Sequence, residues 1–463
     1  HEKFAYNYIK EKNFFMPVEY SSTNGIEKFL LEISKHGWEK VYEEGKTIAL
    51  KKDNQSITLE PGGQVELSGA PLANIHQACK ETNSHLKLLK EIGEKLGITL
   101  LGLGARPLEK TNSIPWMPKP RYKIMKNYMP KKGNHGLDMM LSTCTVQANL
   151  DYSDEDDMRN KTLLSVKIQP LLTALFANSP ISNGVPNGFL SKRRYFWTNT
   201  DTDRCGTLKI AFEDDFSFSK YTDYALSVPM YFIRRNNHYI DCSGESFNSF
   251  MNGKLKQLPS EKPTIQDWED HLSTIFTEVR LKKFIEVRGA DAGNWRRTCA
   301  LPAFWVGILY DHESLRRGLS ICDNWTYSEV EKLSLDVSKY GLKAKIKGYA
   351  IKEIISELIS VSKKGLKRRS IIDNKGKDET QYLKVLEEIS ISGKNIDTGL
   401  AFQEHARRSL NTVVEKYFHN AVSGQVTLEK ADSGFTVKTR VALSRRMELE
   451  STGRAADAHA ALD

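Results

Sequence analysis

The stretch LEPGGQVELSGAP (Leu59–Pro71) places two carboxylates on either side of a glycine pair within a strand-like pattern. With the strand period of two, Glu60, Gln64 and Glu66 lie on one face and the apolar residues on the other. Six residues of straight strand would separate the two carboxylates by about 20 Å, too far for one metal ion to bridge. The stretch therefore predicts either a bend at Gly62–Gly63 or two separate ions.

Two further stretches alternate between an apolar and a polar face. TVQANLDY carries Gln147 and Asn149 on its polar face, and KFIEVRGAD carries Glu286 and Arg288. A sheet with one solvated face would explain any one of these stretches. Yet the three polar faces combine carboxylates and amides with almost no lysine, and such oxygens suit magnesium, while arginine makes paired hydrogen bonds to phosphate. The alternative interpretation is therefore a magnesium–phosphate site on a sheet surface.

Composition restricts the class of protein. The chain has 463 residues, 40% of them hydrophobic, with a net charge of +9, which fits a globular protein with a sizeable core. The lysines and arginines are scattered, so the sequence predicts no nucleic-acid partner. No apolar run reaches the roughly 18 residues that span a bilayer, so no membrane partner is expected. Six cysteines without a CxxC pair favour a reducing, cytoplasmic setting.

Strands and helices are mixed along the chain without a strict β–α–β alternation, which predicts an α+β fold. Helices are expected over 72–96, from Ser153 to about Asn178, and over 268–279. Most of the chain beyond residue 327 also has helical periodicity. No internal repeat is visible, and no long linker forces a domain boundary.

Other common reaction sites do not fit the sequence. EEGKT at Glu43–Thr47 lacks the first glycine of a phosphate-binding P-loop, no GxGxxG fingerprint precedes a helix, and no HExxH zinc motif occurs. Cys144 borders a polar strand face, but a lone cysteine is more often buried and inert than nucleophilic. Arg121 and Arg193 lie among aromatic residues. They either pack as surface cations on rings or bind substrate carboxylates, and the pattern alone leaves both open.

Seven longer stretches together resemble the glutamate–cysteine ligase family, in the branch shared by plants and some proteobacteria. They are LEPGGQVELSGAP, PRYKIMKNYMP, GLDMMLSTCTVQANLD, ALFANSP, PNGFLS, DYALSVPMYF and EVRGADAGNWRRTCALPAFWVG. The resemblance covers roughly residues 1 to 400 in the same order. HEKF at His1–Phe4 resembles the family's opening EHEKF without its first glutamate, which belongs to a metal-ligand pair in the family.

The resemblance implies a fold like that of glutamine synthetase, a curved, mainly antiparallel sheet packed by helices, for a catalytic domain over residues 1–400. It implies that ATP and magnesium serve to join the γ-carboxylate of glutamate to the amine of cysteine through a γ-glutamyl phosphate, the first step of glutathione synthesis. A monomer or homodimer is expected. The alternative is a related carboxylate–amine ligase of the same fold with another amine acceptor. Residues 401–463 have no counterpart in the family and are expected to form a helical C-terminal tail.

By the same resemblance, particular residues of this sequence match functional positions of the family. The metal ligands are Glu2, Glu60, Glu66 and Glu286, with Gln147 where a more distant bacterial branch has a histidine ligand; Asn149 is a nucleotide or metal contact; Arg288 stabilises the transferred phosphoryl group; Arg121 and Arg193 hold substrate carboxylates; Tyr122 and Tyr231 form the cysteine-binding wall. The three polar faces then belong to one active site.

Two cysteines match a regulatory pair of the plant enzymes. Cys79 and Cys299 occupy the positions of a disulfide there, although on the helix pattern Cys79 fits an inert core residue equally well. A second plant disulfide would use Cys242, whose partner position is Gln257 in this sequence. We therefore expect the second bridge to be absent.

Overall fold

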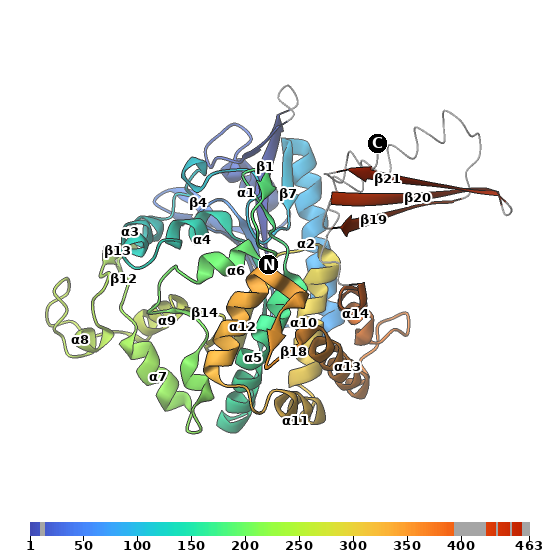
Figure 1. The fold of residues 1–463 in the computed structure, drawn as a ribbon. Helices are drawn as coiled ribbons and strands as arrows, with labels where there is room; N and C mark the ends of the chain where they lie inside the picture. The colour runs from blue at the N-terminus through green and yellow to red at the C-terminus, as the bar shows by residue number, and fades with distance from the viewer. Residues whose placement is uncertain (10–13, 393–422, 432–433, 445–446, 456–463) are drawn as a thin grey trace. The chain divides into compact units, whose positions relative to one another are not determined.

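A computed structural model describes residues 1–9, 14–392, 423–431, 434–444 and 447–455 of the chain. The chain divides into two compact units, His1–Ile391 and Ser392–Asp463 (Figure 1). Helices and mostly antiparallel strands occur together without a regular alternation, which confirms the mixed α and β class predicted from the sequence.

The first unit contains many short strands and a set of longer helices. Its strands are β1 (Glu2–Ile9), β2 (Phe14–Pro17), β3 (Glu39–Glu43), β4 (Lys46–Lys52), β5 (Gln55–Leu59), β6 (Val65–Ser68), β7 (Ile98–Leu101), β8 (Thr145–Leu150), β9 (Ile181–Ser182), β10 (Val185–Pro186), β11 (Cys205–Gly206), β12 (Phe232–Arg235), β13 (His238–Asp241), β14 (Phe276–Thr277), β15 (Val279–Leu281), β16 (Ile285–Asp291), β17 (Lys345–Ile346) and β18 (Tyr349–Ala350). Its helices are α1 (Ile26–Ser34), α2 (Ile75–Leu96), α3 (Pro120–Tyr128), α4 (Gly136–Ser142), α5 (Glu155–Phe176), α6 (Lys192–Trp197), α7 (Phe218–Ser227), α8 (Phe247–Met251), α9 (Ile265–Ser273), α10 (Trp295–Leu309), α11 (His312–Ile321), α12 (Tyr327–Tyr340) and α13 (Ile351–Arg369), and α14 (Lys384–Ser392) ends at the boundary between the units. None of the described helices is both long enough and apolar enough to cross a membrane.

The N-terminal part of the first unit is built on a seven-stranded sheet with the order β2–β1–β6–β5–β4–β3, in which β7 also pairs with β1. A hairpin turn joins β5 to β6, with three residues between Glu60 and Gln64: the Gly63 N–H donates to the Glu60 carbonyl oxygen, and the Glu60 N–H donates to the Gln64 carbonyl oxygen, both at 2.9 Å. Gly63 has φ +81°, the left-handed conformation that such a turn takes at its last loop residue. The predicted bend at the glycine pair is thus a hairpin turn.

A second sheet joins segments that are far apart in the sequence, in the order β15–β16–β8. Its antiparallel register sets Glu286 between Arg280 and Asn149. The alternate, apolar residues of these strands, such as Ala148 and Val287, share one buried cluster with α5 and α10. The predicted period of two is therefore confirmed, and Glu286 belongs to the face turned away from these helices.

One predicted helix is displaced from its expected range. The helix expected over 268–279 is α9, which begins after a capping box at Thr264 and ends at Ser273. The following residues are rich in β-branched side chains, which favour strands, and they form β14 beside β11 and β15 beside β16. The strand β15 brings Arg280 into the second sheet.

The second unit has strands where the sequence predicted a helical tail. β19 (Ser423–Ala431), β20 (Gly434–Ser444) and β21 (Met447–Ala455) form an antiparallel sheet in the order β19–β20–β21. The segment GFTVKTRVAL alternates with the strand period of two, which the expectation of a helix over 401–463 overlooked. The rest of that range lies outside the described residues.

The helices α10 and α13 approach each other most closely at two glycines, Gly307 and Gly365. A Cβ at Gly365 would overlap the Gly307 carbonyl oxygen, a backbone atom that cannot turn away. We therefore expect Gly365→Ala to lower the free energy of unfolding in urea by about 1–3 kcal/mol, although alanine is the better helix former. Ser356→Ala, at an exposed position of α13, is the control and should change that free energy by less than about 0.5 kcal/mol. Equal stabilities of the two variants would contradict the close approach.

Candidate functional site

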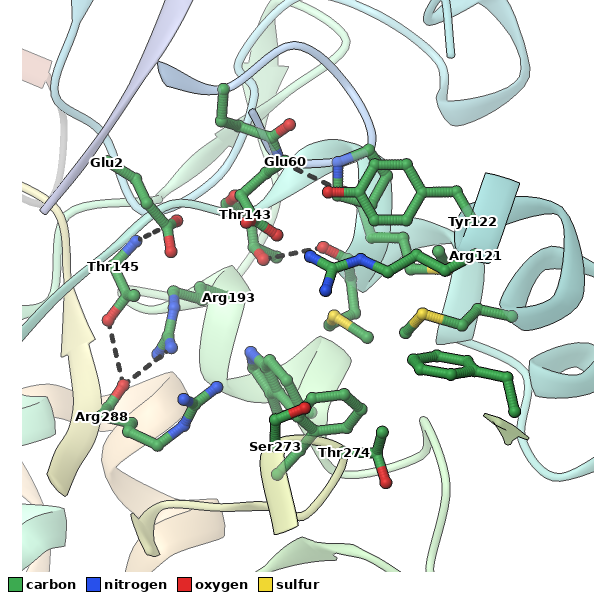
Figure 2. Close-up of a pocket in the computed structure, with 18 residues that line it drawn as sticks. Glu2, Glu60, Arg121, Tyr122, Thr143, Thr145, Arg193, Ser273, Thr274 and Arg288 are labelled. Carbon is green, nitrogen blue, oxygen red and sulfur yellow. Dashed lines mark hydrogen bonds between the residues drawn. The ribbon is translucent and has the colours of Figure 1, made fainter. Parts of the chain in front are cut away.

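A pocket of the first unit collects side chains from both large sheets and from the helices between them (Figure 2). Its lining comes from β1, the β5–β6 turn, α3, α4, α6, β12, the segment from α9 to β14, and the second sheet. The predicted site residues among the lining are Glu2, Glu60, Arg121, Tyr122, Arg193 and Arg288. The pocket therefore brings together residues that span most of the first unit's sequence.

Three predicted carboxylates cluster around the β5–β6 hairpin. Glu2 lies opposite Glu66 in the register of β1 and β6, and the turn carries Glu60 back toward them. Glu2 is 8% exposed, and burial together with the charges of Glu66 and Glu60 raises its pKa to about 8. Burial and the charge of Glu66 also raise the pKa of Glu60. Burial and mutual repulsion thus disfavour the charged forms of these carboxyl groups, and a bound cation would favour them.

The donor atoms of this acidic cluster fit magnesium. The Thr145 N–H donates to Glu2 Oε2 at 2.9 Å, and the Thr58 hydroxyl donates to Glu66 Oε2 at 3.0 Å, so these bonds leave the second oxygen of each carboxylate for another ligand. Within the described ranges, no three His, Cys, Asp or Glu side chains are arranged so that they could hold a metal ion by themselves. Magnesium usually takes one or two carboxylates and completes its shell with water and phosphate oxygens. The cluster therefore fits an ion that a phosphate-bearing substrate helps to hold.

The turn that carries Glu60 is held by two buried side chains, Gln64 and Arg106. Gln64 Nε2 donates to two carbonyl oxygens of the segment before β8, at 3.2 and 2.9 Å, and Gln64 Oε1 accepts from the Gly62 N–H at 2.9 Å. Arg106 Nη2 donates to the Gly62 carbonyl oxygen at 2.7 Å. The polar pattern of the stretch had singled out Gln64, whereas nothing in the sequence pointed to Arg106.

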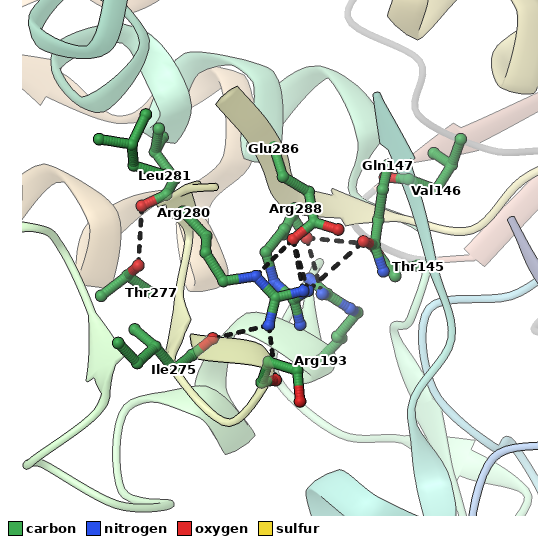
Figure 3. Close-up of polar contacts among 12 residues, drawn as sticks. Thr145, Val146, Gln147, Arg193, Ile275, Thr277, Arg280, Leu281, Glu286 and Arg288 are labelled. Atoms are coloured by element: carbon green, nitrogen blue, oxygen red, sulfur yellow. Dashed lines mark hydrogen bonds and ion pairs between the residues drawn. The ribbon is translucent and has the colours of Figure 1, made fainter. Parts of the chain in front are cut away.

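Charged side chains on β15 and β16 form a row, shown in Figure 3. Arg280 Nε donates to Glu286 Oε2 at 2.6 Å, and Arg288 Nη1 donates to the same oxygen at 3.1 Å and to Gln147 Oε1 at 3.4 Å. Burial would raise the pKa of Glu286, but the charges of Arg280, Arg288 and Lys282 outweigh it and lower that pKa to about 2. Glu286 therefore fixes the Arg288 guanidinium. Arg280 is a site residue that the sequence reading missed, because only the pairing of β15 with β16 reveals it.

Four predicted residues lie beside the pocket without lining it: Glu66, Gln147, Asn149 and Glu286. Asn149 is exposed and lies opposite Glu286 in the register of β8 and β16. These residues belong to the acidic cluster or to the polar face of the second sheet. A ligand that extends out of the pocket along this face would meet them.

The two predicted substrate-binding arginines reach the pocket from different elements, α3 and α6 (Figure 2). Arg193 is 3% exposed, and its Nη2 donates to the Arg288 carbonyl oxygen at 2.8 Å, while no acceptor in the described part of the chain reaches its Nε. The Arg121 guanidinium lies 5.4 Å from the ring centre of Tyr122, whose hydroxyl donates to the Leu59 carbonyl oxygen at 2.6 Å. A buried guanidinium with an unused donor favours binding of a carboxylate or phosphate.

Tyr231 is placed away from the pocket wall. Its hydroxyl donates to Asp201 Oδ2 at 3.1 Å, and the Arg204 guanidinium lies 3.8 Å from its ring centre. The ring packs near Phe276, which does line the pocket. In this structure Tyr231 therefore supports the wall from behind, while Tyr122 belongs to the wall itself.

All six cysteines are free thiols, and two of them lie next to each other. Cys79 on α2 and Cys299 on α10 are both buried and lie close enough for the Cys299 thiol to raise the pKa of Cys79, so the predicted pair is adjacent in its reduced form. Cys242 is buried, whereas Gln257 is exposed. Cys144 is also buried, and burial raises the pKa of its thiol well above the ordinary value, which argues against a nucleophilic role.

Two family models match parts of the chain. A family model described as glutamate-cysteine ligase family 2 matches residues 1–416, and a model described as Sigma 54 modulation protein / S30EA ribosomal protein matches residues 389–463. Glutamate–cysteine ligase B, chloroplastic, of Oryza sativa subsp. japonica is 50% identical over 393 residues, which cover 85% of this chain and 77% of that protein. The chloroplastic glutamate–cysteine ligase of Arabidopsis thaliana is 50% identical over 393 residues, covering 85% of this chain and 73% of that protein. The Nicotiana tabacum protein of the same name is 48% identical over 421 residues, which cover 90% of this chain and 78% of that protein.

Arg280 is expected to stabilise the first unit through its ion pair with Glu286. Arg280→Met leaves the buried carboxylate partly unpaired, so the free energy of unfolding should fall by up to about 3–5 kcal/mol. The double variant with Glu286→Gln also removes the negative charge and should recover part of that loss. Urea unfolding at pH 7 measures both effects. If the losses of the two single variants simply add in the double variant, the ion pair is not their cause.

Proposed function

The chain belongs to glutamate-cysteine ligase family 2, and we propose that the pocket and the polar sheet faces beside it are the active site. The chain joins the γ-carboxylate of glutamate to the amine of cysteine, the first step of glutathione synthesis. One observation carries the assignment of the site: a buried acidic cluster lies close to a row of arginines. Magnesium would supply a cation to the acidic cluster, and the phosphates of ATP would supply an anion to the row of arginines.

We propose ATP as the co-substrate of the first step. Arg121 and Arg193 bind carboxylates of the amino-acid substrates. An oxygen of the glutamate γ-carboxylate attacks the γ-phosphorus of ATP, the bond from that phosphorus to the β–γ bridging oxygen breaks, and ADP leaves. Arg288, fixed by Glu286, donates hydrogen bonds to the phosphoryl group in transfer, where preorganised donors lower the barrier. The product of this step is γ-glutamyl phosphate.

In the second step the amine of cysteine attacks the carbonyl carbon of γ-glutamyl phosphate. The bond from that carbon to the phosphate oxygen breaks, inorganic phosphate leaves, and the nitrogen releases a proton to solvent. Tyr122 forms part of the cysteine site, with Tyr231 supporting it from behind. Cysteine is favoured over another amine acceptor because the curated relatives are themselves named glutamate–cysteine ligases.

The acidic cluster is the proposed place for magnesium. Glu2, Glu60 and Glu66 would hold it, and Glu286 would contribute the oxygen that its arginine partners leave free. When bound, magnesium neutralises the triphosphate so that an anionic carboxylate can approach it. The two amides of β8, Gln147 and Asn149, are placed to contact the nucleotide or the ion at the open end of the sheet.

Several broader features of the family are also proposed for this chain. The antiparallel seven-stranded sheet with the pocket at its side supports a fold like that of glutamine synthetase. We propose a monomer or homodimer in the cytoplasm; the word chloroplastic in the relatives' names describes those proteins. The contact between the Cys79 and Cys299 thiols supports formation of a disulfide under oxidising conditions.

We propose that the catalytic domain ends near residue 400 and that the remaining chain is a separate module. The match of residues 389–463 to the Sigma 54 modulation protein / S30EA ribosomal protein model supports this division, as does the compact unit Ser392–Asp463. The description of that model favours a contact with the ribosome. Such a contact would revise the prediction that the chain has no nucleic-acid partner.

Glu60→Gln is expected to lower kcat/KM for ADP release by about a hundredfold or more, because the magnesium that would neutralise the triphosphate loses a carboxylate ligand. Release should need glutamate and cysteine together, and the variant should need more magnesium to reach its maximum rate. A coupled assay of ADP release across magnesium concentrations measures this. Glu39→Gln, an exposed carboxylate of the same sheet, is the control. Equal activity of the two variants would exclude Glu60 from metal binding.

A chain that ends at Ile391 is expected to keep its kcat/KM within about twofold, because every proposed active-site residue lies in the first compact unit, which has its own core. ADP release with glutamate and cysteine, compared with the full chain at equal concentration, measures this. A folded but inactive shortened chain would show that the C-terminal module is part of the catalytic machinery.

A further inference from the structure

A third basic side chain, Lys282, belongs to the polar face that carries Arg280 and Glu286. β15 ends at Leu281, and the Lys282 N–H donates to the Phe284 carbonyl oxygen at 2.8 Å, which closes the tight connection to β16. Because Arg280 lies opposite Glu286 in the register, the strand period of two puts Lys282 on the same face, one position further toward the connection.

Lys282 differs from Arg280 in how its donors are used. Arg280 donates to Glu286 and, through Nη1, to the carbonyl oxygens of Ser273 and Ile275, both at 2.8 Å, so its guanidinium is largely occupied. Lys282 is half-buried, and its Nζ lies 5.7 Å from the ring centre of Phe284, while no hydrogen-bond acceptor or acidic partner in the described part of the chain reaches that Nζ. Burial and the charge of Arg280 lower the pKa of Lys282 to about 8. An ammonium group in such a position favours binding of an anion.

The row as a whole carries excess positive charge. Arg280 and Arg288 pair with the single carboxylate of Glu286, and Lys282 adds a third cation to the same face, so three minus one leaves two positive charges. Arg288 lies at the end of the row next to Arg193, which donates to its carbonyl oxygen and lines the pocket. Lys282 lies at the other end, about 13 Å away along the strand. An elongated anion with several charges fits this row better than a single phosphate does.

We infer that Lys282 binds the α- and β-phosphates of ATP, while Arg288 meets the γ-phosphate at the pocket. The inference rests on the proposed use of ATP, and it assigns a nucleotide contact to a residue outside the motifs that the sequence pattern had singled out. Lys282 acts in binding and takes no part in the chemical step. Its loss should therefore weaken ADP and ATP alike, whereas binding of glutamate should not change.

Lys282→Met tests this contact, with Lys283→Met as the matched control. The Lys283 side chain is 87% exposed and pairs with Glu269 at 3.1 Å, so it points to a different environment only one residue away. We expect the Kd of ADP, measured by isothermal titration calorimetry with magnesium, to rise about 10- to 100-fold in Lys282→Met. The KM for ATP should rise with it, the KM for glutamate should stay within about twofold, and Lys282→Arg should restore most of the affinity.

The outcomes separate this inference from the ligase proposal. If Lys282→Met binds ADP as tightly as the unchanged chain and Lys283→Met do, the nucleotide contact is wrong while the proposed use of ATP stands. If the unchanged chain binds neither ADP nor ATP, the proposed use of ATP fails and the inference fails with it. Circular dichroism checks the fold of each variant, and Lys282→Gln replaces Lys282→Met in the comparison if the methionine variant does not fold.

Discussion

A tight turn, in which a Cβ at Gly62 would overlap the Leu141 carbonyl oxygen, sets the geometry of the acidic cluster. The Gly63 N–H closes the turn on the Glu60 carbonyl oxygen, and Arg106 holds the Gly62 carbonyl oxygen from the other side. Each of these contacts fixes backbone rather than a side chain, and the fixed backbone brings Glu60 back toward Glu2. On a straight strand the two glutamates of this stretch would lie about 20 Å apart. Their shared excess of negative charge therefore depends on the hairpin.

The two sheets differ in how their buried carboxylates are stabilised. On the second sheet, Glu286 is neutralised by Arg280 and Arg288, and the result is a guanidinium held at a fixed place. On the first sheet, burial and the charge of Glu66 raise the pKa values of Glu2 and Glu60. The carboxylates of the first sheet would be stabilised by a cation, and the basic side chains of the second sheet would be stabilised by an anion. A magnesium–nucleotide complex satisfies both, which is why the proposed reaction follows from their proximity.

The period of two was enough to predict the polar face of the second sheet, because it depends only on local geometry. It placed Glu286 and Asn149 on that face. A period cannot show where a chain reverses, so the bend at Gly62–Gly63 was predicted from the glycine pair, as one of two alternatives for that stretch. Arg280 was missed because its role depends on the pairing of β15 with β16. The prediction of a helical tail over 401–463 was wrong for the described strands because helical periodicity was extended past residue 400. Tyr231 matches a family position, but its side chain packs behind the pocket wall, and a motif carries no information about side-chain direction.

The central claim is that the acidic cluster is an open cation site completed by a nucleotide. Electron paramagnetic resonance of Mn²⁺, a hard cation that takes the same oxygen ligands, tests it by counting the ions bound per chain in the presence of ADP. The unchanged chain and Glu39→Gln should bind the same number of ions, and Glu60→Gln should bind at least one ion fewer or bind it markedly more weakly. Unaltered Mn²⁺ binding in Glu60→Gln would contradict the claim.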